Sequence, residues 1–115
     1  MPKPHRAKVK KAPGGSALLF AALGDPTRLQ LVSRLADGAP LSITSLTAGT
    51  RVTRQAITKH LRVLEEAGVL RGTRRGRERL WRIERQGLRQ ARRYLELISS
   101  QWDDALSRLQ KLVEQ

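Results

Sequence analysis

Apolar positions from residue 53 to residue 68 (TRQAITKHLRVLEEAG) recur with the period of an α-helix. Ile57, Leu61 and Leu64 are spaced by four and three residues, so they share one face and predict a helix packed on a core. Thr53 is suited to the N-cap, because its hydroxyl accepts a hydrogen bond from a free backbone N–H, and a glycine at residue 68 suits the helix end. The opposite face is polar and basic and consists of Arg54, Gln55, Thr58, Lys59 and Arg62.

A β-hairpin is predicted directly after this helix. Its strands are expected over residues 69–74 and 79–83, and the connection RGRE contains Gly76, which permits a positive φ. Trp81 and Ile83 alternate with polar or smaller neighbours in the second strand, so we expect both side chains in the core.

Three shorter helices are predicted before the turn at residues 49–52. They are expected over residues 16–23, 26 to about 36, and 43 to about 48, with N-caps at Ser16, Asp25 and Ser42. In the second of these helices the expected inward stripe is formed by Leu29, Val32 and Ala36, with Leu31 and Leu35 beside it.

A long helix is predicted from Arg85 to about Val113. Its apolar residues are spaced alternately by three and four over four heptads: Leu88, Ala91, Leu95, Ile98, Trp102, Ala105, Leu109 and Leu112. This is the seam spacing of helices that associate with one another. A single small domain covers only the first part of such a seam, so we expect a homodimer rather than packing within one chain. The expected interface residues are Leu88, Leu95, Ile98, Trp102, Ala105 and Leu109.

The order of these elements predicts a mainly α-helical fold with a small β-hairpin, namely a winged helix-turn-helix with a long C-terminal dimerisation helix over about 85–113. We expect one such domain over residues 16–115. Residues 1–15 contain three prolines and five Lys or Arg residues, which predicts a flexible basic arm. The sequence is equally compatible with two roles for this arm, contact with DNA and a purely solubilising role.

The charge balance indicates a polyanionic partner. The chain has 23 Lys and Arg against 10 Asp and Glu, a formal net charge of +13. Residues 51–93 hold 14 basic and 4 acidic residues, which gives 14 − 4 = +10. Charge alone does not separate DNA, RNA and acidic lipid. Here the basic residues collect on one helix face and one hairpin, and no apolar run approaches the length of a membrane span. We therefore expect a nucleic-acid-binding protein with no membrane partner. It lacks an apolar secretory segment, so we expect it in the cytoplasm.

Four sequence strings between residues 20 and 83 carry a family resemblance. They are ALGDPTR at 22–28, TRQAITKHLRVL at 53–64, EAGVL at 66–70 and RGR at 75–77. Together they resemble the ArsR-like winged helix-turn-helix transcriptional regulators. The resemblance implies a dimer that binds an operator in double-stranded DNA, usually as a repressor.

The chain departs from the metal-sensing members of that family. Many of them use a cysteine motif on the short helix before the turn, where this chain has LSITSLT at residues 41–47. Others use His and Asp on the C-terminal helix, and residues 85–115 contain no histidine. Thiolate and imidazole are the usual ligands for such ions. We therefore expect no bound metal and no cofactor, as in the metal-free branch of the family.

The expected DNA-contacting residues are Thr53, Arg54, Gln55, Thr58, Lys59, His60, Arg62, Arg75 and Arg77. Arg54 and Gln55 are the expected base readers, since Arg pairs with guanine and Gln with adenine through two hydrogen bonds. Thr58, His60 and Arg62 are expected at phosphates, and the two hairpin arginines at phosphate or the minor groove. A two-fold dimer predicts an inverted-repeat operator.

Two other functions are less well supported. A non-specific nucleoid-associated or RNA-binding protein is the alternative, although readers of single-stranded RNA need aromatic platforms and this chain has only four aromatic residues. Catalysis is not expected, because the chain has no cysteine nucleophile, no glycine-rich phosphate loop and no paired carboxylates in an apolar setting. The adjacent Glu65 and Glu66 are expected to form a solvated edge.

Overall fold

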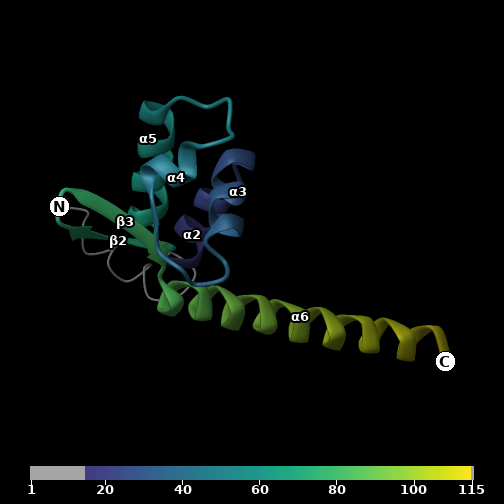
Figure 1. Cartoon of the computed structure of the whole chain (residues 1–115). Helices are drawn as coiled ribbons and strands as arrows, with labels where there is room; N and C mark the ends of the chain where they lie inside the picture. Colours follow the sequence, from purple (N-terminus) through teal and green to yellow (C-terminus); the bar gives the residue numbers. More distant parts are fainter. Residues whose placement is uncertain (1–14, 115) are drawn as a thin grey trace, which may run out of the picture.

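The computed structural model describes residues 15–114, and it confirms a winged helix-turn-helix fold. Four helices form the body of the molecule, a β-hairpin projects from one side, and a long helix leaves from the base (Figure 1). The body helices are α2 (Gly15–Leu23), α3 (Pro26–Arg34), α4 (Ile43–Thr47) and α5 (Arg54–Glu66). The predicted arm at residues 1–15 lies, apart from its last residue, outside the described residues.

The hairpin belongs to a three-stranded antiparallel sheet. Strand β2 (Leu70–Arg75) pairs with β3 (Glu78–Ile83), and β1 (Leu41–Ser42) adds to the other edge of β3, giving the order β1-β3-β2. The sequence did not predict β1, because two residues show no periodicity. The hairpin strands also extend further than predicted, so that two residues connect them instead of four.

The core is formed by apolar side chains from every body helix and from the sheet. The fully buried large side chains are Leu35, Leu46, Ile57, Leu61, Leu64 and Val69. Trp81 of β3 is buried beside them, as predicted, and Ile83 packs against the same cluster at partial exposure. The core therefore holds α5 and the sheet in one unit, which fixes where the basic face and the hairpin lie relative to each other.

Two details of the N-terminal helices differ from the sequence prediction. Helix α2 already includes Gly15, so Ser16 lies within its first turn and is not the N-cap. In α3 the buried residues around its end are Leu31 and Leu35, while Leu29 is 51% exposed. The run LQLV permits two different apolar stripes, and packing of α3 against α2 and α5 selects the one through Leu31 and Leu35.

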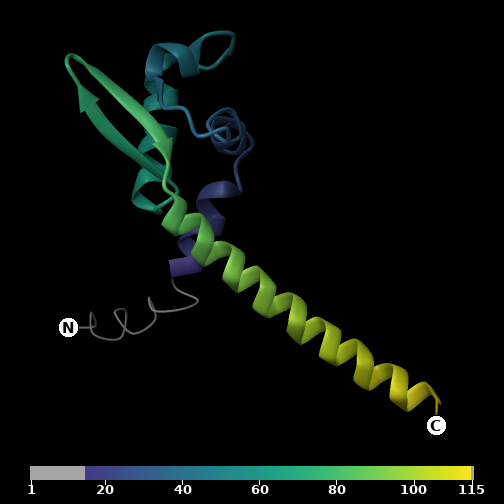
Figure 2. The same ribbon diagram turned by 60° about the horizontal axis from the view of Figure 1, so that its bottom comes forward.

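Helix α6 (Arg85–Glu114) begins beside the turn that ends α5. A Cβ atom at Gly87 would overlap the carbonyl oxygen of Gly68, so glycine permits this close approach. Ala91 is the only buried residue of α6 among the described ones, and the rest of the helix, about 45 Å long in total, extends away from the body (Figure 2). Within residues 15–114 no helix is both long and apolar enough to cross a membrane.

Candidate nucleic-acid interface

The helix-turn-helix is formed by α4, the turn after it and α5. Each helix begins with a side-chain cap: Ser42 Oγ accepts from the Ser45 N–H at 3.2 Å, and Thr53 Oγ1 accepts from the Ala56 N–H at 3.1 Å. The hydroxyl hydrogen of Thr53 remains free to donate, and the residue is exposed at the start of α5. Both caps were predicted from the sequence.

Helix α4 is held to α3 by an arginine. The guanidinium of Arg34 donates to the carbonyl oxygens of Leu46 at 2.7 Å and Ser45 at 2.8 Å. Carbonyls near a helix end lack partners in the helix itself, so a guanidinium that donates to them stabilises that end. Arg34 thus fixes the first helix of the motif, a role that its sequence position did not predict.

Five of the predicted DNA-contacting residues lie together on the exposed face of α5. They line a shallow hollow of about 350 Å³: Arg54, Gln55, Thr58, Lys59 and Arg62. Thr58 is half-buried and its hydroxyl donates to the Arg54 carbonyl at 2.9 Å, whereas the other four side chains are exposed. The surface therefore combines a bidentate cation, a bidentate amide and two further positive charges along one helix.

A contact from α4 orients one of the expected base readers. Arg54 Nη1 donates to Thr44 Oγ1 at 3.2 Å, so the guanidinium is held at the N-terminal end of α5. The remaining N–H groups of Arg54 are available to a ligand. Thr44 was not found from the sequence, because it contributes to no apolar stripe and meets α5 only after the turn brings the two helices together.

His60 lies on the side of α5 that faces the junction of α2 and α3. Its Nδ1 is 3.3 Å from Arg28 Nη1 and 3.9 Å from an Asp25 carboxylate oxygen, and Arg28 also donates to the Ala22 carbonyl. The guanidinium has no acceptor atom, so Nδ1 accepts and the proton of neutral His60 lies on Nε2. A phosphate contact by His60 stays a prediction, and it requires this Nε2–H.

Asp25 completes this junction. It caps α3 as predicted, because its carboxylate accepts from the Arg28 N–H at 3.0 Å. That hydrogen bond lowers the pKa of Asp25 below its ordinary value, with a smaller contribution from the charge of Arg28. The carboxylate is therefore ionised at neutral pH and attracts the arginine that contacts the recognition helix.

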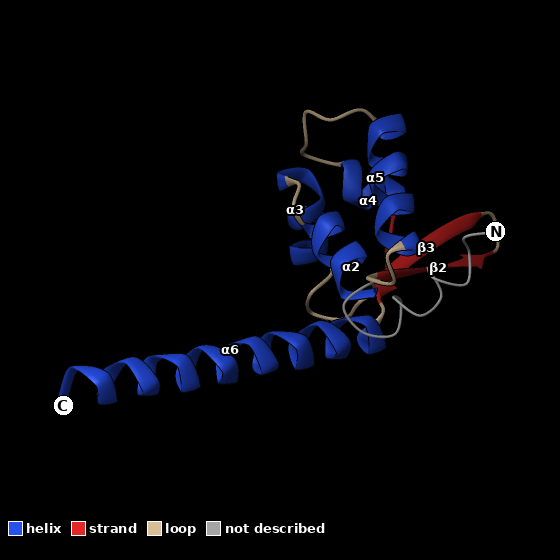
Figure 3. Ribbon diagram, turned by 180° about the vertical axis from the view of Figure 1, so that it is seen from behind, coloured by secondary structure: helices blue, strands red, loops and turns tan. Residues whose placement is uncertain are grey.

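The β2–β3 hairpin is the wing of this fold, and its tip carries the two arginines that were predicted to contact phosphate or the minor groove. Gly76 has a φ of +64°, and within residues 15–114 only glycines have a positive φ, which matches a two-residue turn with glycine at its first central position. Arg75 and Arg77 flank this glycine and are exposed. Seen from behind, strands β2 and β3 extend outward from the helices, so the tip of the hairpin lies apart from the helix bundle (Figure 3).

Glu65 connects α5 to the hairpin, which corrects the expectation of a solvated edge. One of its carboxylate oxygens accepts from the Gly72 N–H at 3.3 Å and lies 3.5 Å from Arg79 Nη2. The Arg79 guanidinium in turn lies 5.0 Å from the centre of the Trp81 ring, a cation–π distance. Glu65 is half-buried and Arg79 is exposed, so the ion pair between them contributes modestly. Together with the buried Trp81 these contacts orient the wing relative to α5.

Glycine at position 72 leaves room for the Arg79 and Trp81 side chains of this network. A Cβ atom there would lie 2.8 Å from Arg79 Nε and 3.0 Å from the Trp81 ring.

Among residues 15–114 no group of three His, Asp or Glu residues is placed to hold a metal ion.

The comparisons with known proteins agree with this geometry. A family profile described as "Helix-turn-helix domain" matches residues 23–73. The chain is 38% identical over 73 residues to YuzN of Bacillus subtilis, described as an uncharacterized HTH-type transcriptional regulator, and the match covers 58% of this chain and 79% of that protein. The structure superposes on the ArsR-like transcriptional regulator from Rhodococcus sp. RHA1 with a TM-score of 0.74 and 36% identity, over 85% of this chain and 92% of the other.

A more distant neighbour shares the fold alone. It is the homodimeric winged helix-turn-helix DNA-binding domain of Mb0332 from Mycobacterium bovis, with a TM-score of 0.58 and 21% identity over 82% of this chain and 83% of the other. The identity to the nearer relatives, over most of their length, shows that this chain belongs to the ArsR-like family of helix-turn-helix transcriptional regulators, which bind DNA and are not enzymes.

Proposed function

We propose that the protein is a dimeric repressor that binds a specific inverted-repeat operator without sensing a metal through Cys or His ligands. The observation that carries this proposal is the exposed face of α5, where polar and basic side chains line one hollow on a helix that the core holds rigidly. A helix of this kind in a helix-turn-helix enters the major groove, where base edges differ between sequences.

The contacts divide into two classes by chemistry. Arg54 and Gln55 stand at the start of α5 and form two parallel hydrogen bonds to guanine and adenine, respectively. Phosphates are contacted by Lys59 and Arg62 on α5 and by Arg75 and Arg77 on the wing, together with Thr53, Thr58 and His60. Phosphate contacts set affinity and register, while the first two residues supply the sequence preference.

The dimer forms through the part of α6 that the body leaves uncovered. Leu88 packs against the core of its own chain, and Ala91 is buried there, so the inter-chain seam begins after them. Leu95, Trp102 and Leu109 are more than half exposed, and Ile98 and Ala105 share their face. The Mycobacterium bovis domain of the same fold is homodimeric, which agrees with an association of this kind.

Two identical recognition helices related by a two-fold axis fit half-sites about one DNA turn, or roughly 34 Å, apart. An occupied operator near a promoter excludes polymerase, which is the simplest way for such a dimer to act. The chain has no cysteine, so no thiolate is available to a metal ion.

Selection of duplexes from a random pool tests the proposal. Wild-type protein is expected to enrich one inverted repeat, which then gives a footprint with two symmetric halves, and a chelator is expected to change neither result. The Arg54→Ala/Gln55→Ala variant is the matched control, because it keeps the wing and the dimer helix. Enrichment of no sequence by the wild type, with equal protection of all duplexes, would instead establish a nucleoid-type protein. Stronger binding to single-stranded RNA would establish the RNA-binding alternative.

A further inference from the structure

A cluster of arginines lies at the base of the hairpin, and none of these arginines is among the proposed operator contacts. Side chains alternate between the two faces of a strand, so Arg82 lies on the opposite face of β3 from the buried Trp81. The register places Arg82 directly opposite Arg71 of β2. Like charges directly opposite each other destabilise a sheet, so this pair favours an anion between or beside the two guanidinium groups.

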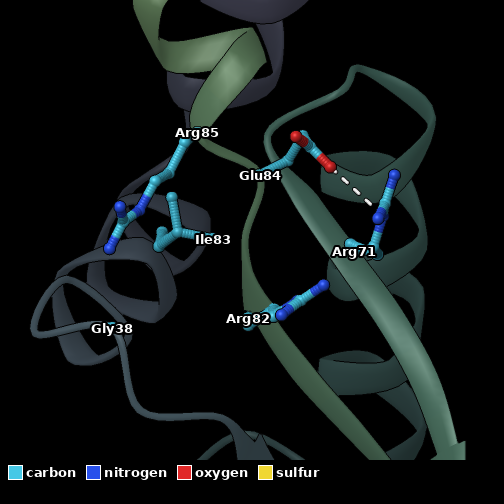
Figure 4. Close-up of a pocket in the computed structure, with 6 residues that line it drawn as sticks. All are labelled: Gly38, Arg71, Arg82, Ile83, Glu84 and Arg85. Atoms are coloured by element: carbon cyan, nitrogen blue, oxygen red, sulfur yellow. Dashed lines mark ion pairs between the residues drawn. The ribbon is translucent and has the colours of Figure 1, made fainter.

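These arginines line a hollow of about 260 Å³ between the sheet, the start of α6 and the loop before β1. Its lining consists of Gly38, Arg71, Arg82, Ile83, Glu84 and Arg85. Figure 4 shows the Arg82 side chain pointing toward Arg71, while Arg85, the first residue of α6, points to the other side of Ile83 toward Gly38. Positive charge therefore stands at both ends of the hollow.

The single carboxylate of the hollow is already engaged. Glu84 Oε1 lies 3.2 Å from Arg71 Nε, and Glu84 Oε2 accepts from the Gln86 N–H at 3.3 Å in the first turn of α6. Among the residues described here, no carboxylate forms an ion pair with Arg82 or Arg85. The lining has three arginines and one glutamate, so its net charge is 3 − 1 = +2.

We propose that this hollow binds a phosphate-bearing anion through Arg82 and Arg85, with Arg71 completing the site beside Glu84. Guanidinium groups match the oxygen geometry of phosphate and donate two parallel hydrogen bonds to it. Arginines at both ends of the hollow suit a ligand with two linked phosphates better than one with a single phosphate. A bound anion also relieves the repulsion between Arg71 and Arg82.

The phosphate has two possible sources, which are a free metabolite and the backbone of bound DNA. The hollow lies on the base of the wing, away from the tip, and the reading face of α5 is lined by different residues. The inference therefore does not require that the proposed operator exists. The wing and the dimer helix meet at the hollow, so the contact between these two elements would depend on the concentration of a free anion that binds there.

Titration calorimetry of the full chain with inorganic pyrophosphate, and with inorganic phosphate, tests the site at constant ionic strength. The variant is Arg82→Ala/Arg85→Ala, and the matched control is Arg93→Ala/Arg108→Ala, which removes the same charge from exposed positions of α6. Circular dichroism checks that all three proteins are folded. We expect the wild type and control to bind pyrophosphate more tightly than phosphate, and the variant to bind it about ten-fold more weakly for each guanidinium removed.

A second measurement identifies the source of the phosphate. If none of the proteins binds free pyrophosphate but the variant lowers the salt dependence of binding to duplex DNA by about two ion equivalents relative to the control, the phosphate belongs to DNA and the site stands. Equal pyrophosphate binding by variant and control, or no difference between them in either measurement, would overturn the inference. Calorimetry without DNA reads this site even if no operator is selected, so the two proposals fail separately.

Discussion

Helices α5 and α6 each carry a regular apolar stripe, but the body of the protein covers the stripe of α5 and leaves most of the stripe of α6 exposed. Ile57, Leu61 and Leu64 of α5 are completely buried by the body of their own chain. On α6, Leu95 is 53% exposed and Trp102 is 63% exposed. Helical periodicity therefore indicates that a face requires cover, and it does not indicate which molecule provides it.

The difference has a simple physical origin. The body packs around α5 from several sides, while α6 leaves the body soon after Ala91. Tyr94 still faces Phe20 of α2, with ring centroids 6.1 Å apart, and Leu95 and Trp102 beyond it are exposed. A contiguous exposed apolar stripe is uncommon on monomeric proteins and marks an interaction site. Burying a Leu side chain contributes about 1.5–3 kcal/mol, so the same residue type stabilises the fold in α5 and is available for assembly in α6.

The largest effect is expected from breaking the uncovered stripe. Leu95→Ala combined with Trp102→Ala removes the largest apolar groups of the proposed interface, and aromatic anchors commonly dominate such contacts. Sedimentation should show a monomer, and operator affinity should fall to the non-specific level, a decrease of about 10³-fold or more.

Leu97 offers a close control, because it is as exposed as Leu95 and lies off the seam. Leu97→Ala combined with Trp102→Ala should therefore weaken the dimer less than the seam pair. Equal behaviour of the two double variants would show that the seam is not the interface. The N-terminal helix around the exposed Leu18 would then be the next candidate.

A core substitution tests the covered stripe. Leu61→Ala should lower the free energy of unfolding by about 2–5 kcal/mol, because it leaves a cavity among fully buried neighbours. Leu109→Ala should change it far less when measured at concentrations where the protein is monomeric. Chemical denaturation measures both. A large decrease from Leu109→Ala under those conditions would mean that the α6 stripe packs within one chain.

The polar face of α5 is expected to give a smaller and sequence-dependent effect. Gln55→Ala should weaken binding by about 1–3 kcal/mol for operators with adenine at its position and little for others. Competition binding with single-base operator variants measures this pattern. A uniform decrease across all variants would place Gln55 at the backbone instead.

The smallest effect is expected at the wing. Arg75→Ala combined with Arg77→Ala should weaken binding to every duplex alike and reduce the salt slope by about one for each phosphate that the wing no longer neutralises. Affinity measured over a range of salt concentrations gives the slope. An unchanged slope would show that the tip does not bind phosphate in the complex.

Local chemistry made much of the site predictable. The caps at Thr53 and Ser42, the basic face of α5 and the glycine turn of the wing each depend on residues within one or two helical turns, so the sequence was sufficient to place them. The contacts that orient the site join distant residues. Two such contacts are those of Thr44 with Arg54 and of Glu65 with Arg79. They form only after the chain folds back, so the spacing of these residues in the sequence did not predict them.

The sequence by itself determined the order of the helices, the hairpin, the two faces of α5 and the apolar stripe of α6, because side-chain periodicity and capping are local properties of the backbone. The tertiary structure decided which stripe of α3 enters the core, that β1 joins the sheet, and that Arg82 lies opposite Arg71. It also decided where α6 leaves the body. Each of these features depends on how several helices and strands pack against one another, and the local sequence of a single element does not specify that packing.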